Sequence, residues 1–199
     1  LCAWGAAMAV LPVRTRSHPA ELGLALFLTS LAVLFGASLV AYLVVRLTGE
    51  RLSSSATVSL PPVLWVGTAL LLAASFALHR SVAAARAEKL ARLRRWLLAA
   101  GGLALLFASL QAVAVVELIE LHAVWLRRQM TLYGIVMVLV ALHAAHVVGG
   151  LVALGWVVNG AFRNRYDHEC CRGLRLCSVY WHFLDAVWLV MLATFWLTT

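Results

Sequence analysis

The stretch "LGLALFLTSLAVLFGASLVAYLVV", residues 22–45, contains no charged side chain. A helix of about 20 consecutive apolar residues is long enough to cross the hydrocarbon core of a bilayer. This stretch therefore predicts a transmembrane helix, and it sets the pattern for the rest of the chain.

Four further apolar stretches follow, and together the five predict an all-α polytopic membrane protein. Of the 199 residues, 64% are hydrophobic and 12% are charged, which is about half the charged fraction of an average soluble domain. Short connections indicate a single domain, an up-and-down bundle of five transmembrane helices. The second helix is expected to begin at Pro61, since proline is tolerated in a first turn. We expect spans at residues 22–46, 61–80, 93–117, 130–158 and 176–198.

The N-terminal segment, residues 1–20, begins with an apolar run over residues 1–13. This run is too short to span a bilayer. We expect it to lie at the membrane interface or to be the end of something longer, since the chain does not begin with Met. It has no charged region before its apolar part, so it is not interpreted as a signal peptide.

The basic residues are distributed unevenly between the two sides of the membrane. Lys and Arg collect in cytoplasmic loops, so the distribution places the N-terminus inside and the C-terminus outside. It also explains the net charge of +8 without a nucleic-acid partner, and it predicts contact with anionic lipid headgroups. Twelve of the sixteen Lys and Arg residues precede the first span, or lie between the second and third or the fourth and fifth: Arg14, Arg16, Arg80, Arg86, Lys89, Arg92, Arg94, Arg95, Arg163, Arg165, Arg172 and Arg175.

Two connecting segments carry further information. "HRSVAAARAEKLARLRRW", residues 79–96, keeps a helical periodicity and predicts a basic hairpin that projects into the cytoplasm. "HECCRGLRLC", residues 168–177, holds three of the four cysteines. Their cytoplasmic placement argues against a structural disulfide, and vicinal cysteines do not suit one tetrahedral zinc ion.

Asp185, within "YWHFLDAVWL" (residues 180–189), is the only carboxylate well inside a predicted span. His182 and Trp181 lie three and four residues before it and share its helix face. An intramembrane carboxylate is a functional candidate by default. A hydrogen-bonded cluster that fixes helix packing and a proton relay both remain open. The sequence favours the packing role, because no second acid lies in line.

A second polar element is "LHAAHVVGGL", residues 142–151. It places His143 and His146 on one helix face, next to the small Gly149 and Gly150, which permit close helix approach. Haem held between helices needs ligands on opposite walls, and no spacing suits copper. We therefore predict no catalytic, cofactor-binding or metal site, and a buried polar cluster between helices made of His143, His146, Tyr180, Trp181, His182 and Asp185.

Three arginines lie near predicted span ends: Arg46, Arg94 and Arg95. Long basic side chains at such positions commonly extend to the headgroup region. We expect that placement here, and a specific phospholipid contact remains open.

The quoted motifs resemble those of subunit III of the haem–copper oxidases, the cytochrome c oxidase and quinol oxidase family. "YWHFLDAVWL" is similar to the family's last helix, and "LHAAHVVGG" to the helix before it. "FLTSLAVLFGASLVAYLVVR", "LPPVLWVGTALLLAAS" and "RRWLL" with "LQA" resemble its first three helices. The resemblance covers nearly the whole chain after Glu21 and fits the five-helix bacterial form.

This resemblance implies an accessory subunit that has no catalytic centre of its own. It implies a place in a bacterial inner membrane beside catalytic subunit I and subunit II, which would carry the haem and copper. It further implies lipid binding, stabilisation of subunit I, and support for proton uptake and oxygen access. Asp185 and His182 would then join the last two helices, with His143 and His146 as candidate partners. The family commonly has acids where this chain has Leu31 and Ala114, so roles of those acids do not carry over.

Three alternatives remain open at this point. A related subunit could accompany a nitric oxide reductase, which the missing acids favour. A haem-binding cytochrome would use His143, His146 and His182. A proton-coupled transporter would centre on Asp185, although no broken helix or internal repeat supports it.

Overall fold

The computed structural model describes residues 19–49, 63–125, 131–163 and 172–198. All five helices are long and apolar enough to cross a membrane, which confirms the predicted all-α five-helix membrane fold. The helices are α1 (Pro19–Gly49), α2 (Val63–Arg86), α3 (Leu90–Trp125), α4 (Thr131–Phe162) and α5 (Arg172–Leu197).

The predicted basic hairpin is formed by α2 and α3, which extend beyond the expected spans and are joined by a tight turn. The Lys89 N–H donates to the Ala84 carbonyl and the Glu88 N–H to the Ala85 carbonyl, both at 3.1 Å. This is a Schellman ending, in which the residue after the helix adopts a left-handed conformation. Glu88 has a φ of 58°, although glycine usually occupies such a position.

Two predictions fall largely outside the described residues. The expected first residue of the second helix, Pro61, lies in the undescribed range 50–62, and the described part of α2 begins at Val63. The expected N-terminal segment, residues 1–20, overlaps the described chain only at Pro19 and Ala20, where α1 begins.

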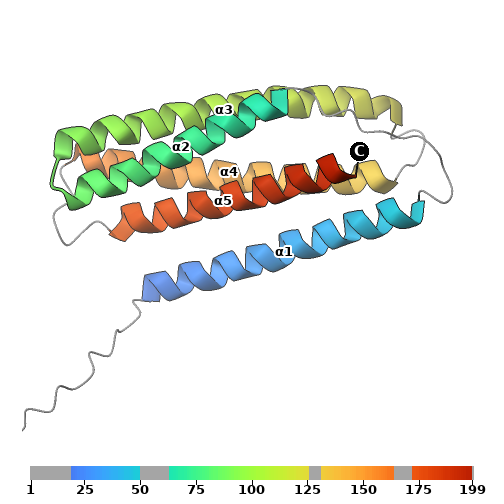
Figure 1. The fold of residues 1–199 in the computed structure, drawn as a ribbon, viewed down its shortest axis with the longest axis horizontal. Coiled ribbons are helices and arrows are strands. Elements are labelled where there is room, and N and C mark those ends of the chain that lie inside the picture. The colour runs from blue at the N-terminus through green and yellow to red at the C-terminus, as the bar shows by residue number, and fades with distance from the viewer. Residues whose placement is uncertain (1–18, 50–62, 126–130, 164–171, 199) are drawn as a thin grey trace, which may run out of the picture.

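The five helices run alternately up and down in three layers (Figure 1). The α2–α3 hairpin forms one outer layer, α4 and α5 lie in the middle, and α1 lies along the opposite side. α5 contacts α1, α2 and α4, while α4 contacts α1, α3 and α5. Polar groups on α5 can therefore meet three different neighbours.

The core lies in two parts around α5. The larger part includes Leu71, Phe107 and Trp181, and the smaller part joins α1 to α4 and α5 through Phe35 and Met191. Half of the spanning window of α5 is buried, against 17% for α1 and for α3. A side chain on α5 is thus the best placed in the chain to be held from several sides.

Candidate functional site

The six residues of the predicted polar cluster do not form one buried cluster in the structure: they make separate contacts, and the His182 side chain is exposed. Tyr180 and Trp181 contact the backbone of α4. His182 instead bonds to Ser75 on α2, with Asp185 beside it. Residues three or four apart share a face, whereas adjacent residues diverge, which is why Trp181 and His182 reach different neighbours.

The contact between α4 and α5 is built around Gly150. The Tyr180 hydroxyl donates to the His146 carbonyl at 2.9 Å, and the Trp181 Nε1–H donates to the Gly150 carbonyl at 3.3 Å. A Cβ atom at Gly150 would lie 3.2 Å from both Leu184 Cδ1 and Tyr180 Cε1. At Gly149 a Cβ would meet only the Tyr180 hydroxyl, at 3.6 Å. A side chain at position 150 would therefore push against α5, whereas one at position 149 would make only an ordinary contact.

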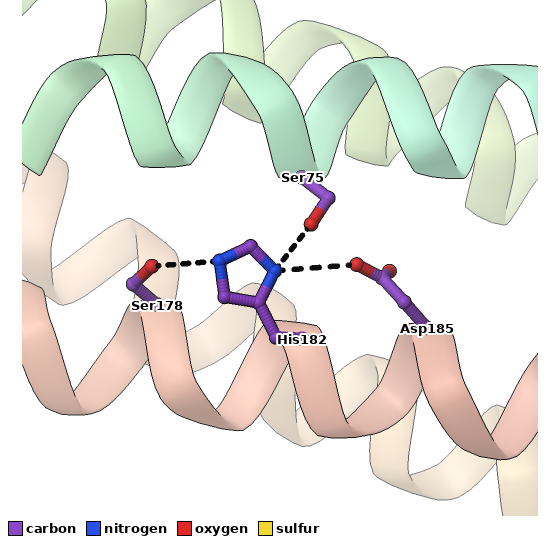
Figure 2. Close-up of polar contacts among 4 residues, drawn as sticks. All are labelled: Ser75, Ser178, His182 and Asp185. Atoms are coloured by element: carbon purple, nitrogen blue, oxygen red, sulfur yellow. Dashed lines mark hydrogen bonds and ion pairs between the residues drawn. The ribbon is translucent and has the colours of Figure 1, made fainter.

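The contact between α2 and α5 is a cluster of four polar side chains, Ser75, Ser178, His182 and Asp185, which we call the histidine cluster (Figure 2). His182 Nδ1 lies 2.6 Å from Ser75 Oγ, and its Nε2 lies 3.3 Å from Ser178 Oγ. Asp185 Oδ2 lies 3.6 Å from the same Nδ1. The serine of α2 is thus the closest partner of the imidazole, and the carboxylate stands beside it at ion-pair distance.

The expected partners of Asp185 and His182, namely His143 and His146, have other contacts. The His143 ring stacks on Trp188, with centroids 5.2 Å apart, and meets the edge of Phe35. His146 Nδ1 bonds to the Leu142 carbonyl of its own helix at 2.6 Å. The reason is geometric, because the His182 face of α5 is turned toward α2 rather than α4. The prediction that Asp185 and His182 join α5 to α4 through His143 and His146 is therefore wrong: His182 contacts Ser75 on α2.

The histidine cluster is open on one side in the isolated chain. The His182 side chain is 45% exposed, whereas that of Asp185 is 9% exposed. His79, one turn beyond Ser75, is also exposed, and its ring centroid lies 6.3 Å from that of His182. We call this surface, formed by Ser75, His79, His182 and Asp185, the α2–α5 polar face.

The α2–α5 polar face runs from one end of the expected spans into the depth of a bilayer. At a rise of 1.5 Å per residue, His182 is about 9 Å along α5 from residue 176, where the expected span begins. The hydrocarbon core is about 30 Å thick. His182 therefore reaches the surface of the bundle within the hydrocarbon core, whereas His79 lies at the end of the expected span 61–80, next to Arg80.

Two of the three arginines expected to reach lipid headgroups instead bind the ends of neighbouring helices. Arg46 donates from Nε and Nη2 to the Thr198 carbonyl, at 3.1 and 2.7 Å. Arg94 donates from Nε to the Ala161 carbonyl at 3.2 Å and lies over the Phe162 ring. The last carbonyls of a helix lack partners within it and carry partial negative charge. Both arginines thus act as clamps between helices, whereas Arg95 is exposed.

Within the described residues, no group of three or more His, Cys, Asp or Glu side chains is placed to hold a metal ion. His143 and His182, required by the cytochrome alternative, face different neighbours. Cys177 is buried as a thiol. Asp185 is the one buried carboxylate in the described ranges.

Sequence reasoning did not identify the two serines of the histidine cluster. Ser178 lies four residues before His182, so its spacing on one helix face was an available signal. Ser75 lies in the apolar stretch "LLLAASFALH" of another helix, and nothing in that stretch indicates which helix it faces.

Comparison with known proteins adds relatives that cover most of the chain. It is 26% identical over 179 residues to the cytochrome c oxidase subunit 3 of Thermostichus vulcanus, covering 89% of this chain and 87% of the relative. It is 27% identical over 174 residues to the protein of the same name in Synechocystis sp., an alignment that covers 85% of this chain and 71% of the relative. It is 30% identical over 125 residues to the probable cytochrome c oxidase subunit 3 of Mycobacterium tuberculosis, an alignment that covers 62% of this chain and 60% of the relative.

No family model matches the sequence. The relatives nevertheless confirm the resemblance drawn from the motifs, because homologues with one name occur in cyanobacteria and actinobacteria. Together with the five spanning helices, they make this chain a multi-pass membrane protein homologous to proteins named cytochrome c oxidase subunit 3.

Proposed function

We propose that this chain is the non-redox accessory subunit III of a respiratory haem–copper oxidase in a bacterial plasma membrane. The homology over up to 89% of the chain supports a place in the oxidase complex. Haem and copper belong to the partner subunits in this proposal. Oxygen reduction then takes place in subunit I, and this chain stabilises that subunit.

The observation that carries the proposal is the α2–α5 polar face. Polar side chains in the middle of a membrane almost always face a protein interior or a water-filled cavity, because lipid offers them no hydrogen bond. Here His79 and His182 face outward from the bundle. A second membrane protein that covers this face removes the cost of exposing the His182 imidazole to lipid. We assign that role to a helix of subunit I.

The histidine cluster also supports a contribution to proton uptake. An imidazole can accept a proton on one nitrogen and release one from the other. The exposed side of His182 faces the expected partner, and Asp185 lies behind it at 3.6 Å. Stabilisation of subunit I and proton delivery would therefore use the same surface.

Orientation completes the proposal. The N-terminus lies in the cytoplasm and the C-terminus outside, which is supported by the uneven distribution of Lys and Arg. The basic α2–α3 hairpin then faces the cytoplasm. A reporter fused after Thr199 that is active only in the cytoplasm would contradict this orientation.

The deciding experiment is retention of the chain in the complex purified through a tag on subunit I. We expect His182→Leu to lower the amount of this chain per haem several-fold, because it removes the central group of the polar face. The control is Ser109→Ala, since Ser109 is exposed on α3 and bonds only to the Leu105 carbonyl of its own helix. Full retention of a folded His182→Leu chain would refute the assignment.

A second measurement tests the absence of a redox cofactor. The purified chain should show no visible haem absorption. A stoichiometric haem band that disappears in His143→Ala would support the cytochrome alternative instead.

A further inference from the structure

An arginine-lined hollow lies on the outer surface of the α2–α3 hairpin, away from the α2–α5 polar face. It has a volume of about 450 Å³ and is lined by Arg80, Arg92, Arg95, Trp96 and Ala99. Arg80 comes from the last turns of α2, and the other four come from the first turns of α3. Three guanidinium groups from two helices thus border one small space.

The hollow is partly preorganised by aromatic side chains. The Arg80 guanidinium carbon lies 5.7 Å from the centre of the Trp96 ring and 5.8 Å from that of Phe76. The two rings meet edge to face, with centroids 6.3 Å apart. Stacking on an aromatic ring holds a guanidinium in place while its N–H groups stay available. Arg80 is therefore positioned to bind before any ligand arrives.

The charge of the hollow favours an anion. Within the described chain, no carboxylate forms an ion pair with Arg80, Arg92 or Arg95, and all three side chains are exposed. Like charges that share one space repel, and the start of a helix adds partial positive charge. Guanidinium groups bind phosphate oxygens through paired N–H donors. A phosphate group matches this donor set.

The surface below the hollow indicates that the phosphate belongs to a lipid. Arg92, Arg95 and Ala99 lie on one stripe of α3, and the next members of that stripe are Gly102 and Leu106. A Cβ at Gly102 would meet nothing within 4 Å, and Leu106 is 52% exposed. An acyl chain can therefore lie along α3 directly below the guanidinium groups.

Trp96 places the hollow at the correct height for a headgroup. Tryptophan is enriched where the apolar core of a membrane meets the headgroups. Basic pockets between helices on the cytoplasmic side suit anionic lipid headgroups. We propose that the hollow binds the phosphate headgroup of an anionic phospholipid, with Arg80, Arg92 and Arg95 as its ligands and the α3 stripe below them as the acyl-chain contact. This proposal does not depend on the complex that the chain joins.

The test measures lipid binding to the full chain in detergent, with phosphatidylglycerol as the probe and phosphatidylcholine as the neutral comparison. The variant combines Arg80→Gln, Arg92→Gln and Arg95→Gln. Each basic residue near a membrane surface strengthens binding roughly fivefold. We therefore expect phosphatidylglycerol affinity to fall on the order of a hundredfold, with little change for phosphatidylcholine.

The matched control combines Arg163→Gln, Arg172→Gln and Arg175→Gln. It removes the same charge from exposed positions at the same end of the bundle. Its affinity for phosphatidylglycerol should fall only a few-fold, through weaker long-range attraction. An equal loss in both triple variants would show that net charge, and not the hollow, attracts the lipid, and the proposal would be wrong.

Two further arms complete the test. Inorganic phosphate should not displace phosphatidylglycerol at millimolar concentration; if it does, the hollow is a phosphate site without lipid specificity and the proposal fails. Should the triple variant not fold, as judged by helix content and thermal unfolding without lipid, Arg92→Gln alone should lower affinity roughly fivefold. An unchanged affinity in a folded Arg92→Gln chain would also overturn the proposal.

Discussion

Replacement of Gly150 by alanine tests how closely α4 and α5 must approach. The new Cβ would lie 3.2 Å from Leu184 Cδ1 and from Tyr180 Cε1, and 3.3 Å from Trp181 Cε2. Favourable carbon–carbon contacts lie at about 3.5–4.0 Å. Three neighbours from one helix are thus too near at once, and α5 must move away from α4 or change rotamers.

The magnitude follows from three effects. Overpacking a well-packed site costs about 1–3 kcal/mol of unfolding free energy. Separation of the helices weakens the Trp181–Gly150 hydrogen bond, which is already long at 3.3 Å, and an intramembrane bond of this kind contributes about 0.6 kcal/mol. Alanine recovers up to about 1 kcal/mol through its higher helix propensity. The net loss for Gly150→Ala is therefore roughly 1–2 kcal/mol.

Gly155→Ala is the matched control. It lies on the same helix, and its Cβ would meet nothing within 4 Å, so only the propensity gain remains. Gly149→Ala, with one ordinary contact at 3.6 Å, should resemble this control. The assay is equilibrium unfolding of the chain in mixed micelles, followed by circular dichroism. The reasoning is refuted if Gly150→Ala unfolds with the same free energy as Gly155→Ala.

Four further substitutions test other contacts. Asp185→Asn should retain the chain in its complex with a modest loss. Asp185→Leu should remove the carboxylate beside His182, lower the unfolding free energy by about 1–3 kcal/mol and weaken retention. Arg46→Met should leave the Thr198 carbonyl without its guanidinium donor and lower the unfolding free energy by about 0.3–1 kcal/mol. The loss should appear as a lower thermal midpoint and as faster exchange of the backbone amides at the end of α5. Glu88→Gly should raise stability by up to about 1 kcal/mol, because glycine adopts the left-handed conformation without strain; an unchanged thermal midpoint would contradict this.

The spans could be predicted from sequence because bilayer thickness limits helix length directly. Five apolar stretches of sufficient length predicted the five helices, and the helical periodicity between residues 79 and 96 predicted the extended hairpin. The close packing at Gly150 followed from the same logic, since a small residue lets two backbones approach. These features depend on one helix at a time, or on residue size alone.

The rotation of each helix about its axis could not be predicted in the same way. In a soluble bundle an apolar stripe marks the buried face. Here exposed side chains such as Trp156 and Leu197 are as apolar as the buried Trp181 and Leu184. The sequence therefore does not show whether His182 faces α2 or α4, and the wrong neighbour was expected.

The hydroxyl partners and arginine clamps were missed for a related reason. A serine or threonine in a membrane helix commonly bonds to the carbonyl four residues earlier, as Thr29 does to Ala25. Ser75 instead bonds to His182 on α5, which requires knowledge of the neighbouring helix. Arg46 likewise lies beside the end of α5 only because of the way the bundle closes.

Both roles considered for Asp185, helix packing and proton relay, involve the α2–α5 polar face. The polar groups around the His182 ring are the hydroxyls of Ser75 and Ser178, at 2.6 and 3.3 Å, and the Asp185 carboxylate, at 3.6 Å. The Asp185 Oδ1 atom is buried and has no hydrogen-bond partner among the described residues. His182 is the exposed member of the pair, so a proton relay would meet the partner subunit at the α2–α5 polar face. Asparagine keeps the packing of this face but cannot carry a proton. Full retention of Asp185→Asn together with oxygen consumption slowed several-fold would therefore identify the relay, whereas normal turnover would leave the packing role.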